Sequence, residues 1–228
     1  IWTNEPNNPP ENDQTTWRRR RLIQIGLHLW PSERGPRQRG QVAMNGEKVA
    51  SGVKHADNIT PCIFGGITLI RAIHPLDIVA LNTPDLFVTV VHPQIEVKTS
   101  DARQILRKEV LLKDAIKQWG NIAGLVTGFM KNDYDLIGRS LEDVIIEPVR
   151  SILIPGFDQV KKQCKEAGAL GGGISGSGPS IFMLSKEKRE ADACEGIMKN
   201  TFEKLGIEYK TYVTRINKTG ARVEEMPG

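Results

Sequence analysis

The sequence predicts an α+β protein in which helices pack on one side of a sheet. Runs of apolar, often β-branched residues are typical of strands, and they occupy residues 67–70, 86–91, 181–184 and 207–216. Apolar residues also recur at spacings of three and four, which indicates amphipathic helices, over residues 116–130, 157–167 and 194–205. The two kinds of segment alternate along the chain, so the class is mixed.

In the first half of the chain, small apolar residues at helical spacing predict a helix over Val42–Val53, which stops at Gly52. Gly65 and Gly66 precede the strand at 67–70. After the strand at 86–91, Thr99 or Ser100 caps a further helix. One helical face is expected from Ile116, Trp119, Ile122, Ala123, Val126 and Met130.

The second half continues the same alternation. Leu136, Leu141, Val144 and Ile145 suggest a helix that Pro148 closes. Another helix spans Phe157–Ala167 and ends at Gly168. The final helix carries Cys194, Ile197, Met198, Phe202 and Leu205 on one side.

Composition narrows the functional classes. The formal net charge is +4, of which residues 1–40 supply +3 through seven Arg and four acidic residues. The remainder is almost neutral and has no basic stripe for nucleic acid. No apolar run reaches the length of a membrane span, and the polar N-terminal residues do not form a secretory signal. The three widely spaced cysteines fit neither a disulfide framework nor a metal site, so we expect a reduced, cytoplasmic protein.

Residues 1–40 differ in texture from the rest. They are rich in Pro, Asn and Arg, with a bare basic run at residues 18–21, and only residues 22–30 alternate as a short strand does. A basic arm that binds RNA is one interpretation. We favour a disordered or out-of-frame segment.

The Gly-rich stretch at residues 171–180 is the most informative segment. It contains five glycines in ten residues, so its backbone can approach a ligand closely and adopt positive φ. Successive N–H groups in such a loop can form an anion nest. The stretch is neither a Walker loop nor a Rossmann turn, and a flexible turn is the competing interpretation.

Two further groups of polar residues suit a small charged substrate. The first is Glu47 with His55, Asp57 and Asn58, in which a carboxylate could ligate Mg²⁺. Considered alone, Glu47 is better explained as a solvated helix residue, and Asp57–Asn58 as a helix cap. The second group is Thr99, Arg103 and Arg150, whose guanidinium groups can hold a carboxylate or phosphate through two bonds. Each arginine alone is equally compatible with a surface charge.

Together these groups are far more specific, because their spacing resembles that of homoserine kinases, a branch of the GHMP small-molecule kinases. The matching segments are Glu47-x7-His55-Ala56-Asp57-Asn58-x2-Pro61-x3-Gly65-Gly66, Thr99-x3-Arg103, Asp143-x3-Glu147-Pro148-x-Arg150 and Gly173-Ile174-Ser175-Gly176-Ser177-Gly178-Pro179-Ser180. The resemblance runs from about Gln41 to Val223, and residues 92–99 are similar to Bacteroidetes members.

The resemblance implies a GHMP kinase fold. Residues 41–84 would be the remnant of an incomplete N-terminal βαβ domain, and residues 85–228 a ferredoxin-like C-terminal domain, with the substrate cleft between them. It also implies transfer of the γ-phosphoryl group of ATP to the side-chain hydroxyl of homoserine, in threonine biosynthesis. Positioning and charge neutralisation carry most of such a reaction, so no general base is assigned. A homodimer is compatible with the resemblance.

The resemblance assigns roles residue by residue. Glu47 would ligate Mg²⁺, and the Gly-rich motif would support the phosphates through Gly173, Ser175, Gly176, Ser177 and Gly178. The substrate pocket would use His55, Asp57, Thr99, Arg103, Arg150 and Gly176.

One departure is serious. The family places a Gly/Ser-rich phosphate loop before the segment that carries Glu47, whereas residues 1–40 show no such loop. Because loss of these electrostatic groups costs orders of magnitude in rate, we expect little or no activity from these 228 residues. Two alternatives stay open: a second GHMP specificity such as mevalonate, against which His55–Asn58 argues, and a non-catalytic amino-acid-binding or regulatory module.

Overall fold

The computed structural model describes residues 57, 59–97 and 104–221. The chain divides into two compact units, residues 1–82 with 217–228, and residues 83–216. Each unit is described by itself. Helix 42–53 and the helix start at Thr99–Asp101, both predicted from the sequence, lie outside the described residues.

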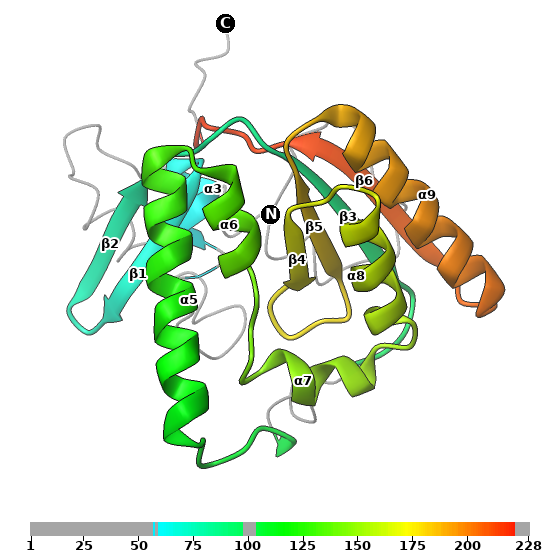
Figure 1. Ribbon diagram of the computed structural model, residues 1–228, viewed down its shortest axis with the longest axis horizontal. Helices are drawn as coiled ribbons and strands as arrows, with labels where there is room; N and C mark the ends of the chain where they lie inside the picture. The colour runs from blue at the N-terminus through cyan, green and yellow to red at the C-terminus, as the bar shows by residue number, and fades with distance from the viewer. Residues whose placement is uncertain (1–56, 58, 98–103, 222–228) are drawn as a thin grey trace, which may run out of the picture. The chain divides into compact units, whose positions relative to one another are not determined.

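The described part of the first unit is a helix and a β-hairpin (Figure 1). Helix α3 spans Ile59–Phe64, and strands β1 (Ile67–Ile73) and β2 (Leu76–Leu81) pair antiparallel. Apolar side chains of all three elements form a small core around buried Ile59 and Leu76. Strand β1 was predicted from its β-branched run; α3 and β2 were not.

The second unit contains a four-stranded antiparallel sheet in the order β4-β5-β3-β6. Its strands are β3 (Phe87–Pro93), β4 (Gly171–Ile174), β5 (Ile181–Ser185) and β6 (Tyr209–Arg215). The central strand β3 is the run that the sequence marks most strongly, and Val88 and Val91 on it are fully buried. The strands predicted at 86–91, 181–184 and 207–216 are confirmed to within two residues.

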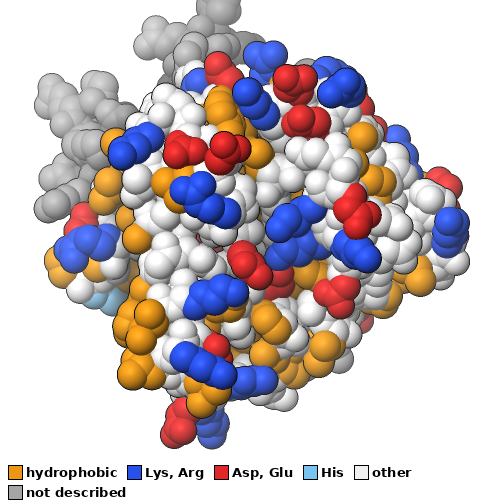
Figure 2. All heavy atoms as spheres, viewed as in Figure 1, with side chains coloured by type: hydrophobic (Ala, Val, Ile, Leu, Met, Phe, Trp, Pro, Cys, Tyr) orange, Lys and Arg blue, Asp and Glu red, His pale blue; other side chains and the backbone are white. Residues whose placement is uncertain are grey.

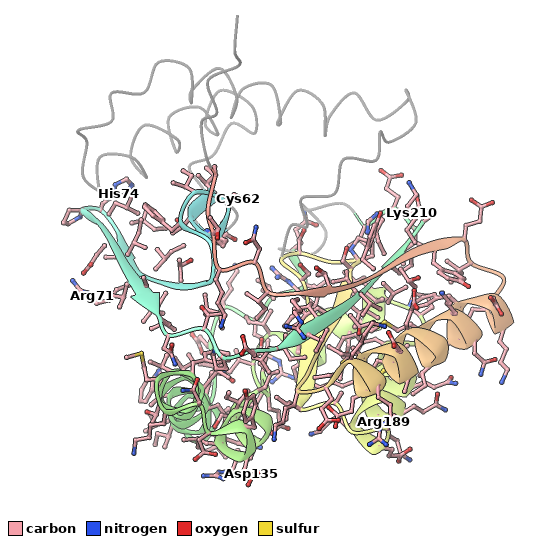
Figure 3. The ribbon with its side chains drawn as sticks, turned by 90° about the horizontal axis from the view of Figure 1, so that it is seen from above. Cys62, Arg71, His74, Asp135, Arg189 and Lys210 are labelled. Atoms are coloured by element: carbon pink, nitrogen blue, oxygen red, sulfur yellow. The ribbon has the colours of Figure 1, made fainter. Side chains whose placement is uncertain are left out.

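Helices α8 (Phe157–Glu166) and α9 (Lys188–Lys204) pack together and against the sheet, so both cover the same face. Arg189 of α9 and Lys210 of β6 project from opposite sides of this helix–sheet layer (Figure 3). The core between helices and sheet includes Val160, Cys164, Met183, Met198 and Phe202. This confirms the predicted α+β arrangement with helices on one side.

Helix α5 (Leu112–Lys131) confirms the predicted helix, but its apolar face does not form the core. Ile116 is 56% exposed and Trp119 61% exposed, and Figure 2 shows hydrophobic side chains at the surface where α5 runs. The helix instead packs its opposite side on α6 (Tyr134–Ser140). Glycine makes this approach close, because a Cβ on Gly128 would lie 2.9 Å from Ile137 Cγ1.

The helix predicted to run from Leu136 to Pro148 is wrong. Helix α6 ends at Ser140, and a new short helix, α7, spans Glu147–Arg150. Between them the Asp143 carboxylate accepts the N–H groups of Ile145 and Ile146, both at 2.8 Å, in place of helical partners. Pro148 lies in the first turn of α7, where its missing N–H is harmless, so it begins a helix and does not close one.

Candidate functional site

A pocket of about 380 Å³ opens within the second unit, between the α5–α6 pair, helix α7 and strand β4. Its polar wall includes Gln118, Ser140, Asp143, Glu147 and Arg150. Its apolar wall is formed by Ile122, Leu125, Leu141, Ile146, Ile174 and Phe182. Backbone of Gly172, Gly173 and Gly176 completes the lining. The pocket therefore offers one cation and several acceptors beside exposed glycine backbone.

The Gly-rich stretch has two parts. Its first four residues are strand β4, where a Cβ on Gly172 would collide with the Phe182 carbonyl oxygen of the neighbouring strand. The remainder is a loop closed by hydrogen bonds from Ser175 N to Ser180 O (2.8 Å) and from Gly178 N to Ser175 O (3.1 Å). Gly176 and Gly178 have φ of 61° and 85°, as the sequence predicts for a loop that needs positive φ.

Arg150 is the predicted substrate residue that the structure places best. It ends helix α7, lines the pocket, and donates from Nη1 to the carbonyl oxygen of Gly176 at 3.0 Å. The structure thus brings together two residues, Arg150 and Gly176, that the sequence assigned to one site. A guanidinium has five N–H donors in a fixed plane, which suits it to a carboxylate or phosphate.

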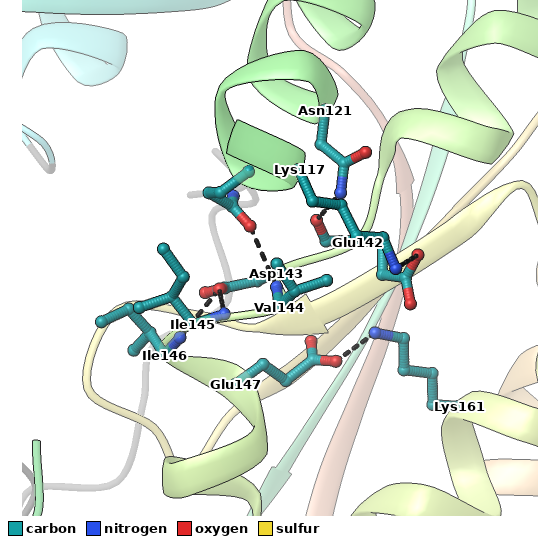
Figure 4. Close-up of polar contacts among 10 residues, drawn as sticks. Lys117, Asn121, Glu142, Asp143, Val144, Ile145, Ile146, Glu147 and Lys161 are labelled. Carbon is teal, nitrogen blue, oxygen red and sulfur yellow. Dashed lines mark hydrogen bonds and ion pairs between the residues drawn. The ribbon is translucent and has the colours of Figure 1, made fainter. Parts of the chain in front are cut away.

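Helix α7 begins at Glu147, whose carboxylate forms an ion pair with Lys161 of α8 (Figure 4). The side chains of Glu147 and Lys161 are only 12% and 16% exposed. Burial raises the pKa of the Glu147 carboxyl, and the hydrogen bond and charge of Lys161 oppose that rise. Glu147 belongs to a segment that resembles homoserine kinases, but neither it nor Lys161 was predicted to have a role in the site.

The segment before α7 is fixed by side chains from two directions, also drawn in Figure 4. Gln118 of α5 accepts the Val144 N–H at 2.9 Å, and Asn121 donates to the Glu142 carbonyl at 2.9 Å. With the Asp143 turn, these bonds connect α5 to the entrance of α7. Sequence spacing gave no signal for Gln118 or Asn121, because they lie more than 20 residues from their partners.

A second contact holds the far end of the Gly-rich loop. His92 Nδ1 lies 2.8 Å from Ser180 Oγ, joining strand β3 to the residue that follows the loop. The sequence analysis had noted both residues only as parts of motifs. Their pairing depends on the antiparallel register of β3 and β5, which brings Val91 opposite Ile181.

The other predicted site residues are not brought together in what the structure describes. Glu47, His55, Thr99 and Arg103 lie outside the described residues. Asp57 is exposed and belongs to the first unit. Ser175, Ser177 and Gly178 lie in the Gly-rich loop. The described residues include no group of three His, Cys, Asp or Glu that could hold a metal ion.

Within residues 57, 59–97 and 104–221, none of the helices is long and apolar enough to cross a bilayer. Cys62, Cys164 and Cys194 are free thiols.

Comparison with known proteins defines the class. Residues 125–204 match the family described as "GHMP kinases C terminal", a segment that includes α7, Arg150 and the Gly-rich stretch. The chain therefore contains a GHMP kinase C-terminal domain, with the GHMP kinase fold that the resemblance implied.

Within that family the relatives are homoserine kinases. The chain is 47% identical over 182 residues to one from Chloroherpeton thalassium, covering 79% of this chain and 57% of the relative. It is 45% identical over 184 residues to one from Chlorobaculum tepidum, with the same coverage. A crystal structure of homoserine kinase from Cytophaga hutchinsonii superposes with a TM-score of 0.81 at 48% identity, covering 86% of this chain and 62% of that one. The chain thus spans less than two thirds of the length of these relatives.

Proposed function

We propose that this chain is the larger part of a homoserine kinase, which transfers the γ-phosphoryl group of ATP to the side-chain hydroxyl of homoserine in threonine biosynthesis. The observation that carries the proposal is the 47% identity over 182 residues to a homoserine kinase. The pocket that contains Arg150 and Gly176 supports it, because these residues occupy the substrate positions of the resembling motifs.

In this proposal Arg150 binds the carboxylate of homoserine through its guanidinium, and it orients the substrate by a two-point contact. Its bond to Gly176 ties the substrate to the Gly-rich loop. That loop would lie beside the phosphates, where positive-φ glycines allow close backbone approach. Phosphoryl transfer depends mainly on such positioning.

ATP and Mg²⁺ belong to the proposal through the family. The described residues do not themselves form a metal site, so Mg²⁺ is assigned to Glu47, which lies outside them, and no step is derived through the ion. When bound, the ion would neutralise phosphate charge. His55, Asp57, Thr99 and Arg103 are proposed to complete the substrate pocket. A cytoplasmic location and a homodimer remain predictions.

These 228 residues contain no Gly-Leu-Gly-Ser-Ser phosphate loop, so we propose that they turn over little or no ATP by themselves. A coupled assay of the purified chain with Mg²⁺, ATP and homoserine tests this. Ordinary kinases turn over at about 1–100 s⁻¹, and a rate within about tenfold of that range would contradict the proposal.

A non-catalytic amino-acid-binding module is the alternative that the sequence left open, and the relatives do not favour it. Calorimetric titration separates the two. The titration is made on a hybrid in which the N-terminal part of the Cytophaga hutchinsonii kinase supplies the phosphate loop. Homoserine binding by this hybrid without any ATP turnover would favour the module. Homoserine-dependent ADP formation under the same conditions supports the kinase.

A further inference from the structure

The ion pair between Glu147 and Lys161 lies where charge is costly. Both side chains are largely removed from water, and burying an ion costs several kcal/mol unless its partners are well placed. Lys161 extends from α8 alongside the Phe157 ring, 5.9 Å from the ring centre. A carboxylate and an ammonium held this way have little freedom to move independently.

The second oxygen of Glu147 is confined by strand β4. A Cβ on Gly173 would lie 2.6 Å from Glu147 Oε2, closer than atoms can approach. Gly173 does not have a positive φ, so its backbone conformation does not require glycine. The Glu147 carboxylate is what excludes a side chain there, and it is therefore fixed between Lys161 and the Gly-rich strand.

Arg150 lies one helical turn after Glu147, at the other end of α7. A helix of four residues has almost no stability of its own, so its position depends on the contacts at its ends. At the start these are the Asp143 turn and the Glu147–Lys161 pair. At the end it is the bond from Arg150 to the Gly176 carbonyl.

We propose that Glu147 and Lys161 are a positioning pair: their ion pair, lodged against Gly173, fixes helix α7 so that Arg150 holds the Gly-rich loop and keeps its guanidinium at the pocket. The functional consequence rests on the proposed kinase activity, whereas the mechanical link from Lys161 to Arg150 does not. Neither Glu147 nor Lys161 is assigned a contact with substrate.

The pair also predicts a pH profile. Burial raises the pKa of Glu147, Lys161 lowers it, and the charges of Asp143 and Glu142 raise it. Strand β4 adds no charge, because it contributes glycine at this point. Acidification therefore protonates Glu147, weakens the pair and loosens Arg150 from the loop.

The test uses the full 228-residue chain without substrate. Lys161→Met removes the cation, Lys161→Arg restores one, and Lys188→Met breaks an exposed ion pair on α9 as the control. The readouts are the NMR signals of the Arg150 guanidinium and the exchange rate of the Gly178 amide, which closes the loop. We expect Lys161→Met to shift the Arg150 signals and speed Gly178 exchange by about tenfold, as loss of one hydrogen bond does. Lys161→Arg and Lys188→Met should keep the parent values.

Gly173→Ala provides an independent route should Lys161→Met fail to fold. It displaces only the end of the Glu147 side chain, so it should produce the same shift of Arg150 and the same faster exchange. Combining it with Glu147→Ala, which makes room, should abolish the additional effect of the alanine. Parent values of the Arg150 guanidinium signals and of the Gly178 amide exchange rate in Gly173→Ala would overturn the inference. The same values in a folded Lys161→Met whose Glu147 pKa has risen would also overturn it. Neither result would bear on whether the chain phosphorylates homoserine.

Discussion

Glu147 and Lys161 form an ion pair of which the two side chains expose only 12% and 16% of their surface. The pair joins helix α7 to helix α8 beneath the Gly-rich strand. Because Arg150 ends helix α7, the same pair stabilises the fold and holds the residue that the family resemblance assigns to the substrate pocket.

Lys161→Met should destabilise the second unit by about 3 kcal/mol at pH 7, because it leaves a buried carboxylate without its partner. Burial holds the pKa of Glu147 above its usual value, and loss of Lys161 raises it further. In Lys161→Met the unpaired Glu147 carboxyl is therefore best accommodated when protonated, and this stabilisation is present below the ordinary Glu pKa and lost as pH rises through the raised one. Urea unfolding should show a smaller loss at pH 5 than at pH 7. An equal loss at both pH values would contradict the burial argument.

Gly172→Ala should destabilise the sheet by about 3 kcal/mol, through overpacking of a fully occupied site. Its Cβ would collide with the Phe182 carbonyl and lie 2.8 Å from Met183 Cα, and backbone atoms cannot move aside easily. Gly196→Ala is the matched control on the exposed side of α9, where an added Cβ would have no other atom within 4 Å. It should stabilise the helix by about 0.5–1 kcal/mol. Thermal or urea unfolding measures both effects. Similar changes in the free energy of unfolding for the two variants would contradict the packing described for Gly172.

Thiol labelling should distinguish the three cysteines. Cys164 and Cys194 are fully buried between α8 and α9, whereas Cys62 is partly exposed. Burial raises the pKa of the Cys62 thiol, so its labelling should be slow at neutral pH and accelerate as pH rises. One thiol per chain should react under native conditions, and none in Cys62→Ser. Reaction of a second thiol without denaturant would show that the α8–α9 core opens more readily than its packing indicates.

Helix α5 gives a direct test of which face is buried. Ile116→Lys, on the exposed apolar face, should change the free energy of unfolding by no more than about 0.5 kcal/mol. Phe129→Ala, at a buried position of the same helix, should cost about 3–5 kcal/mol. The two variants alter an exposed and a buried position of one helix. A large loss from Ile116→Lys would mean that another part of the molecule covers this face.

The strands were predictable because the central strand β3 is buried and its sequence is almost entirely apolar and β-branched. Periodicity also located α8 and α9, whose apolar residues face the sheet. Periodicity located helix α5 but predicted the wrong buried face, because glycines at 124 and 128 let α6 pack on a side that carries few large apolar residues. It failed again at Pro148, because the Asp143 carboxylate competes with helical hydrogen bonds, which a pattern of apolar residues does not record.

Site residues were predictable where a motif held them close in sequence. Arg150 and Gly176 were identified by their motifs, and the structure joins them. Lys161 could not be found this way, because its importance arises from packing against Glu147, 14 residues away on a different helix. His92 and Ser180, 88 residues apart, meet only through strand register.

We propose that the second unit contributes Arg150 and Gly176 to the substrate pocket of a homoserine kinase. The most direct test is a hybrid protein, in which residues 41–228 follow the N-terminal part of the Cytophaga hutchinsonii kinase. Arg150→Lys is the variant, and Arg189→Lys on the exposed side of α9 is the matched control. The measurement is the rate of ADP formation as a function of homoserine concentration. We expect homoserine-dependent turnover in the hybrid. Arg150→Lys should raise the KM for homoserine at least about tenfold, because lysine cannot make the two-point contact. Arg189→Lys should leave that KM unchanged. A folded hybrid without homoserine-dependent turnover, or one in which Arg150→Lys leaves KM unchanged, would contradict it.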